Sequence, residues 1–129
     1  MTYGKFTVLG AAALAIALSA TPGAANAADG DKVFRTKCRA CHSEEKGVSK
    51  VGPSLFGVYG KKAGTVEKFN RYVGLKDAKW EWDDKALDAY LADPNKFVKD
   101  KGAARSGMAF KLTSADERKA VIEYLKTLK

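Results

Sequence analysis

The only two cysteines and the only histidine of the chain lie within one pentapeptide, Cys38-Arg39-Ala40-Cys41-His42. Thiols at this spacing lie about one helical turn apart, so both can reach the vinyl groups on one edge of a porphyrin. The imidazole of His42 then faces the iron and becomes its proximal ligand. The pattern therefore predicts one haem c, attached covalently through thioether bonds to Cys38 and Cys41.

Other uses of these two cysteines fit the sequence less well. A thioredoxin-like Cys-x-x-Cys pair belongs to a βαβ unit, and no segment of the chain shows the alternating pattern of a half-buried strand. A zinc site needs four ligands, whereas the chain offers only two cysteines and one histidine. A disulfide is the usual role of two cysteines in an exported protein, but the histidine that follows them favours haem.

The second axial ligand is expected to be Met108, because Met1 is the only other methionine and there is no second histidine. Ser106 and Gly107 give Met108 a flexible approach, and the apolar residue after it can close a pocket. A lone methionine usually fills a core. Outside a regular helix and beside a c-type haem, however, we expect Met108 to bind the iron.

His/Met ligation raises the reduction potential of a haem above that of a bis-histidine haem and occupies both axial positions. No position is then open for a substrate, so we expect a carrier of single electrons and not an enzyme. Two alternatives stay open. In one, Met108 does not bind and the chain is a five-coordinate peroxidase or gas-binding haem protein; in the other, the haem is only structural.

The N-terminal residues have the parts of a secretory signal peptide. Lys5 supplies positive charge, Val8 to Leu18 are apolar or glycine, and Ala25-Asn26-Ala27 has small residues where signal peptidase requires them. We expect residues 1–27 to be the signal peptide and residues 28–129 to be one periplasmic domain. The apolar run is too short to span a bilayer, so no integral membrane segment is expected after cleavage; an uncleaved anchor is the alternative.

The chain is basic, with 23 Lys and Arg against 15 Asp and Glu and a formal net charge of +8. The basic residues are scattered among acidic ones without a dense stripe interleaved with aromatics, so we do not expect a nucleic-acid partner. We expect a monomer that docks with acidic redox proteins through positive charges around an exposed haem edge. This basic ring consists of Lys32, Lys37, Lys96, Lys99, Lys101 and Arg105.

Capping residues and apolar spacing predict an all-α domain with long loops. Asp29 is expected to cap a helix from Gly30 to Cys41, and glycines punctuate residues 47–64 as turns. The later helices are expected to begin at Asp83, at Asp93-Pro94 and at the capping box of residues 114–117. The last helix has an apolar face formed by Val121, Ile122, Leu125 and Leu128.

Nearly all of residues 29–128 resembles a class I cytochrome c, the single-haem group of mitochondria and bacteria. The matching residues outside the haem motif are Gly30, Phe34, Gly52-Pro53-Ser54-Leu55-Phe56-Gly57, Gly60-Lys61-Lys62-Ala63-Gly64, Trp82-Asp83-Asp84, Leu87-Asp88-Ala89-Tyr90-Leu91-Ala92-Asp93-Pro94, Met108-Ala109-Phe110 and Val121-Ile122-Glu123-Tyr124-Leu125. The resemblance implies the cytochrome c fold, in which three main helices, short helices and long loops wrap around one haem.

The resemblance also implies roles for haem-pocket residues. The carbonyl of Pro53 should accept a hydrogen bond from Nδ1 of His42. Trp82 and Tyr72 should donate to a buried haem propionate, and Tyr90 should lie beside the sulfur of Met108.

The resemblance further implies that Gly30 and Phe34 cross the last helix at Val121 and Tyr124. The chain departs from the family in three respects. Lys61 replaces an arginine common near the propionates, Gly107 replaces a lysine, and the segment between Pro94 and Met108 is longer than in the mitochondrial type. Trp80 has no family role.

Overall fold

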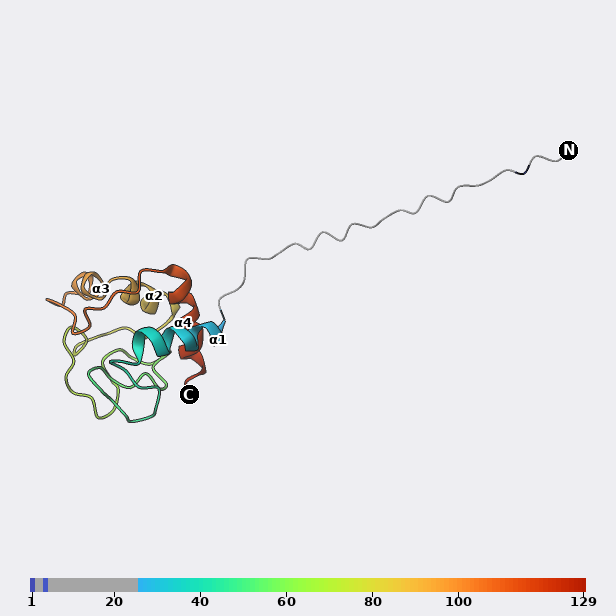
Figure 1. Cartoon of the computed structure of the whole chain (residues 1–129). Helices are drawn as coiled ribbons and strands as arrows, with labels where there is room; N and C mark the ends of the chain where they lie inside the picture. The colour runs from blue at the N-terminus through green and yellow to red at the C-terminus, as the bar shows by residue number, and fades with distance from the viewer. Residues whose placement is uncertain (2–3, 5–25) are drawn as a thin grey trace.

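The computed structural model describes Met1, Gly4 and residues 26–129 (Figure 1). The expected signal peptide falls almost wholly outside the described residues. Within the described part of the chain, no helix is long and apolar enough to cross a membrane. The helical elements are α1 (Ala27–Val33), η1 (Phe34–Cys38), α2 (Asp84–Ala92), α3 (Pro94–Asp100) and α4 (Ala115–Thr127).

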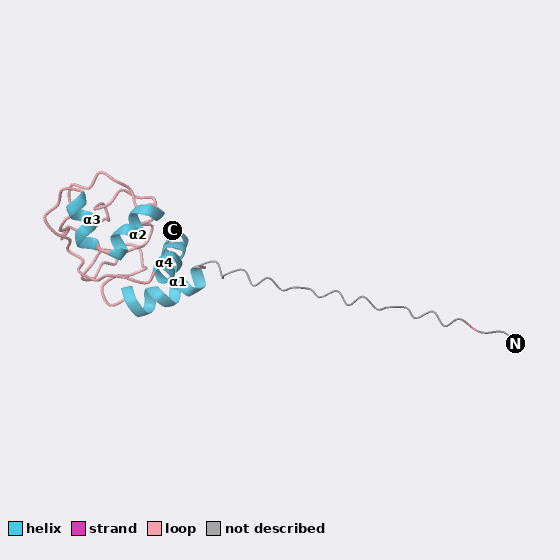
Figure 2. Cartoon of the chain, turned by 90° about the horizontal axis from the view of Figure 1, so that it is seen from above, coloured by secondary structure: helices cyan, strands magenta, loops and turns pink. Residues whose placement is uncertain are grey.

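The domain is all-α, as predicted, and α1 crosses α4 in both views (Figures 1 and 2). Gly30 lies at the crossing, where a Cβ atom would come within 2.0 Å of the carbonyl oxygen of Ala120 and 2.6 Å of the Cβ of Tyr124. Phe34 and Val121 are fully buried beside this contact, and the Phe34 and Tyr124 rings pack 5.6 Å apart. The predicted crossing is therefore confirmed, and only glycine permits the approach.

The three predicted starts of the later helices are confirmed by their capping hydrogen bonds. The Asp83 carboxylate accepts from the N–H of residue 86 at 2.7 Å, and that of Asp93 accepts from residue 96 at 3.0 Å. The Ser114 hydroxyl accepts from the N–H of residue 117 at 3.3 Å. Each cap satisfies one of the amides that a helix N-terminus cannot pair internally.

The first helix differs from the prediction at both ends. It begins at Ala27, and its cap is Asn26, whose side chain accepts the N–H of Asp29 at 3.0 Å; Asp29 as the cap was wrong. The helix also does not continue regularly to Cys41. After Val33 it widens into η1, where the N–H of residue 39 donates to the carbonyl of Phe34, five residues earlier, at 2.9 Å.

Loops and turns form residues 39–83, with one isolated bridge between Lys62 and Glu81 as their only strand-like pairing (Figure 2). The larger core lies between these loops and α2, α3 and α4. Trp80 has a structural place there: its ring packs 5.4 Å from Phe97 of α3 and 6.2 Å from Trp82. The aromatic group therefore joins the loops to α3.

Candidate haem site

The haem motif follows directly from η1. The carbonyl of Cys38 accepts hydrogen bonds from the N–H groups of Cys41, at 3.0 Å, and His42, at 2.9 Å. This turn holds the two cysteines and the imidazole in one short segment. The two cysteines do not form a disulfide with each other, and Cys38 is half-buried while Cys41 is exposed. Burial raises the pKa of the Cys38 thiol to about 11, with a further contribution from Cys41, so the thiol is protonated at neutral pH before it is attached to haem.

The ring of His42 is fixed by Pro53, as predicted from the family resemblance. Nδ1 lies 2.8 Å from the Pro53 carbonyl oxygen. Since a carbonyl only accepts, Nδ1 carries the proton and donates it, and Nε2 keeps its lone pair. Burial lowers the pKa of His42, while the Pro53 hydrogen bond acts in the opposite direction. His42 is therefore a neutral imidazole with Nε2 ready to bind a metal.

Gly52 makes this position of the imidazole possible. A Cβ atom at residue 52 would lie 2.3 Å from Cε1 of His42 and 2.7 Å from Nδ1. The N–H of Gly52 donates to the carbonyl of Cys41 at 2.8 Å, which ties the Gly52-Pro53 loop to the haem motif. The ring thus packs against bare backbone, with Cε1 and Nδ1 nearest to it and Nε2 farther, 3.0 Å from the same Cβ position.

Met108 lies on a segment that the core holds in place. Its N–H donates to the hydroxyl oxygen of the buried Ser106 at 3.1 Å, and the same oxygen is 3.3 Å from the hydroxyl of Tyr90. The N–H of Gly107 donates to the carbonyl of Val73 at 2.9 Å. Met108 is half-buried against the larger core, to which Tyr90 also belongs. Tyr90 therefore lies next to the Met108 segment.

The other predicted pocket residues belong to the same core. Trp82 is 5% exposed, and its ring packs 5.0 Å from that of Tyr90. The hydroxyl oxygen of Tyr72 accepts the N–H of Val66 at 3.0 Å, so its own proton is available to donate. Burial raises the pKa of both Tyr72 and Tyr90, which keeps the two phenols protonated.

These residues fit haem c. Two cysteines that form no disulfide lie one turn apart, the Nδ1 proton of His42 is donated to Pro53 so that Nε2 keeps its lone pair, and a thioether is held on a separate anchored segment. Soft sulfur and neutral imidazole are donors that suit haem iron. Cys38, Cys41, His42 and Met108 would hold the group.

The basic ring is exposed at all six positions, from α1 to the loop after α3. Lys96 pairs with Asp100 at 2.6 Å, and the ammonium of Lys101 lies 5.6 Å from the centre of the Trp80 ring and 5.5 Å from that of Phe97. Cation–π contacts of this kind hold a charge without neutralising it.

A second group of basic residues beside the haem motif escaped the sequence prediction. The side chain of Arg71 donates to the carbonyl of Lys50 at 2.6 Å, and Lys50 donates to the carbonyl of Arg39 at 2.8 Å. All three residues are exposed and come from separate segments. Only Arg39 lies within the haem motif in the sequence, so the sequence alone did not show that Lys50 and Arg71 lie beside it.

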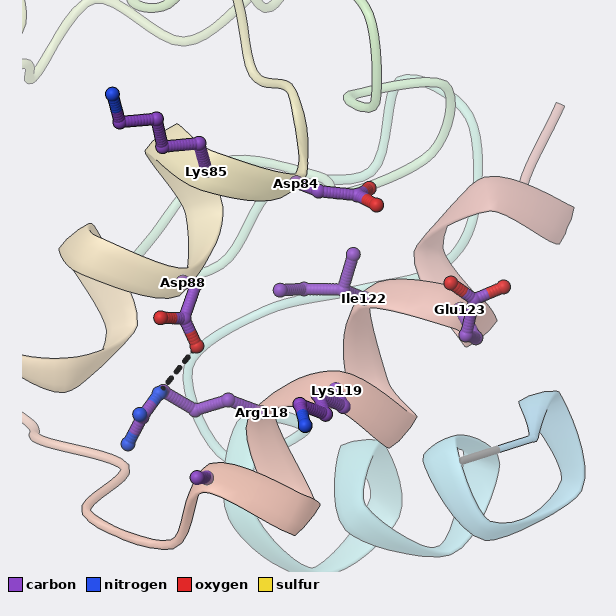
Figure 3. Close-up of a pocket in the computed structure, with 8 residues that line it drawn as sticks. Asp84, Lys85, Asp88, Arg118, Lys119, Ile122 and Glu123 are labelled. Atoms are coloured by element: carbon purple, nitrogen blue, oxygen red, sulfur yellow. Dashed lines mark hydrogen bonds and ion pairs between the residues drawn. The ribbon is translucent and has the colours of Figure 1, made fainter. Parts of the chain in front are cut away.

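Figure 3 shows a groove between α2 and α4, and none of the residues that line it is a predicted haem ligand. Nε of Arg118 donates to the carboxylate of Asp88 at 2.7 Å across this groove. The same guanidinium donates to the carbonyls of Leu112 at 3.0 Å and Thr113 at 2.9 Å. The groove therefore contains an internal tie between α2, α4 and the segment after Met108.

Comparisons with known proteins agree with this geometry. The cytochrome c family model matches residues 27–129. The chain is 42% identical over 125 residues to cytochrome c2 of Rhodospirillum rubrum, covering 92% of each chain. It is also 42% identical over 113 residues to cytochrome c2 of Pararhodospirillum photometricum, covering 82% of this chain and all of the relative.

Solved structures give the same result. Ferricytochrome c2 of Rhodopseudomonas palustris superposes with a TM-score of 0.70 at 39% identity, over 81% of this chain and 99% of the other. Cytochrome cH of Methylobacterium extorquens superposes with a TM-score of 0.68 at 36% identity, over 79% and 98%. The chain therefore belongs to the cytochrome c family, in class I, and carries one covalently attached haem c.

Proposed function

We propose that this haem c electron carrier works in the periplasm and binds its iron through His42 and Met108. The observation that carries the proposal is the hydrogen bond from Nδ1 of His42 to Pro53, which leaves Nε2 free to bind. Two observations on Met108 also support the proposal. The chain has no other methionine except Met1, and the backbone N–H of Met108 is held by the hydroxyl of Ser106. Two occupied axial positions favour outer-sphere electron transfer over substrate chemistry.

The bound haem supplies a centre that gains and loses one electron, and the residues of the chain hold and insulate it. Cys38 and Cys41 attach it by thioether bonds. Tyr72 and Trp82 would donate to a propionate, and such hydrogen bonds would lower the cost of burying a carboxylate. Pro53 and Tyr90 would hold the two ligand segments in fixed orientations.

The ligands are tested with Met108→Ala, using Phe110→Leu as the control two residues away. The ferric parent protein should show the weak far-red band of sulfur-bound haem, and its ferrous form should resist carbon monoxide. Met108→Ala should lose the band and bind carbon monoxide, whereas the control should keep the parent spectrum. If Met108→Ala keeps the band, the assignment is wrong. Carbon monoxide binding by the parent itself indicates a gas-binding protein or peroxidase instead.

The basic ring and the group at Arg39, Lys50 and Arg71 are proposed as the docking surface for acidic redox proteins. Their exposure and the net charge of +8 support this role, because complementary charge steers encounter between partners. We expect a monomer, which gel filtration of the holoprotein checks.

Export is the remaining part of the proposal. Mass spectrometry of the periplasmic fraction should find a mature chain that starts at Ala28. Cleavage after Ala27 removes the Asn26 cap of α1, and Asp29 is then the remaining capping residue. A chain recovered with the N-terminal segment intact in the membrane fraction would favour an uncleaved anchor.

A further inference from the structure

Asn95 makes a contact that no feature of the sequence pointed to. Its side-chain oxygen Oδ1 accepts the backbone N–H of Ser106 at 2.9 Å, from a position 11 residues earlier in the chain. Asn95 is the second residue of α3, directly after the buried Pro94. Ser106 is itself buried, with 6% of its surface exposed. A buried N–H needs a partner, and Asn95 supplies it.

The contact is the first link of a short chain of hydrogen bonds that ends at Met108. The hydroxyl oxygen of Ser106 accepts a hydrogen bond from the N–H of Met108 at 3.1 Å, and the same oxygen lies 3.3 Å from the hydroxyl of Tyr90. Ser106 is also where the chain becomes buried again, because Lys99 to Gly102 and the two residues before Ser106 are exposed. Fixing Ser106 therefore fixes the start of the segment that carries the thioether.

Backbone contacts hold the opposite side of the same segment. The N–H of Gly107 donates to the carbonyl of Val73 at 2.9 Å. Gly74 has φ +83°, and a Cβ atom at this residue would lie only 2.3 Å from the carbonyl oxygen of Arg105, so glycine permits the close approach. These contacts restrain the segment against residues 73–74. Asn95 ties the same segment to α3 through its hydrogen bond with Ser106.

We propose that Asn95 is a positioning residue for Met108, acting through Ser106. The inference rests on the proposed His42/Met108 ligation. An external ligand reaches the iron only when the Met108 segment moves away, so its apparent affinity rises with the population of that open state. Without the Asn95 acceptor, the buried N–H of Ser106 is unpaired only in the closed state. The closed state is therefore the one that Asn95 stabilises.

The test is a titration of the ferric holoprotein with imidazole, followed by loss of the far-red band. Asn95→Ala should bind imidazole about five-fold more tightly than the parent, which at 1.36 kcal/mol per tenfold corresponds to about 1 kcal/mol. Asn95→Asp keeps an oxygen acceptor of the same reach and should restore most of the parent affinity. Ser114→Ala removes the α4 cap, lowers global stability and should leave the imidazole affinity unchanged.

The outcomes separate this inference from the ligand assignment. A far-red band in the parent with the same imidazole affinity in Asn95→Ala refutes the positioning role alone. Equal tightening in Ser114→Ala also refutes it, because the effect is then general loosening of the fold. A parent protein without the band refutes His/Met ligation and, with it, the role of Asn95.

Discussion

Replacing Gly30 with alanine tests the contact on which the domain depends, the crossing of α1 and α4. The new Cβ would lie 2.0 Å from the carbonyl oxygen of Ala120, whereas carbon and oxygen atoms in close contact are about 3.3–3.6 Å apart. The two helices must therefore separate by more than ~1 Å. Such a shift loosens Phe34 and Val121, which are 0% and 1% exposed at the crossing.

Two opposing terms set the size of the effect. Alanine is better than glycine by about 1 kcal/mol in a helix interior, which favours the variant. Overpacking a close contact typically costs about 1–3 kcal/mol, and the separated helices also lose dispersion contacts around Phe34. The contact atom is backbone and cannot turn aside, so the steric term should dominate. We expect Gly30→Ala to lower the free energy of unfolding by about 2 kcal/mol.

The assay is guanidinium unfolding of the holoprotein, followed by far-UV circular dichroism. Lys32→Ala is the matched control, because it is an exposed substitution in the same helix and should stay within about 0.5 kcal/mol of the parent. If Gly30→Ala is as stable as the parent, or more stable, α1 and α4 do not cross at this residue and the argument fails.

Four further predictions follow from side-chain contacts and surface charge. Tyr124→Phe removes a hydrogen bond to Glu44 and should lower the free energy of unfolding by about 1 kcal/mol; an unchanged denaturant midpoint would contradict this. Burial and Glu44 raise the pKa of Tyr124 to about 12, so an absorbance titration should show a phenol ionising there that is missing from the variant. The hydrogen bond from Lys111 lowers the pKa of Asp93, so this contact stabilises the fold above the ordinary pKa of 3.8 and is lost as pH falls through the lower folded value. Asp93→Asn should therefore weaken the acid dependence of stability, and a curve as steep as the parent's would refute the ion pair's role. Electron transfer to an acidic partner should slow between ~0.01 and ~0.15 M salt, because the screening length falls from ~30 to ~8 Å; a rate indifferent to salt excludes charge steering.

The helix starts that the sequence predicted correctly depend on contacts between residues three positions apart. Asp83, Asp93 and Ser114 each accept the N–H of the third residue after them, so the sequence contains both partners of the bond. The same rule failed at α1 because Asn26 and Asp29 are both good caps, and the structure uses the earlier one. The widening at η1 was also missed, since the residues of this turn do not distinguish bonds to the fourth residue from bonds to the fifth.

The site divides in the same way. Cys38, Cys41 and His42 are contiguous, so their chemistry could be predicted without knowing the fold. The Pro53 contact spans 11 residues and was expected from the family resemblance alone. The Asn95 contact spans the same distance but depends on the path of the loop between α3 and Ser106, so neither spacing nor resemblance could give it.

Trp80 and Asn95 help to fix the two ends of the segment between α3 and Met108. The Trp80 ring packs against Phe97 and holds α3 on the core, so the segment leaves from a fixed point. At the other end, Asn95 and Tyr90 hold Ser106. Extra residues between two fixed ends can bulge into solvent, so insertions there should change loop length and leave Met108 in place.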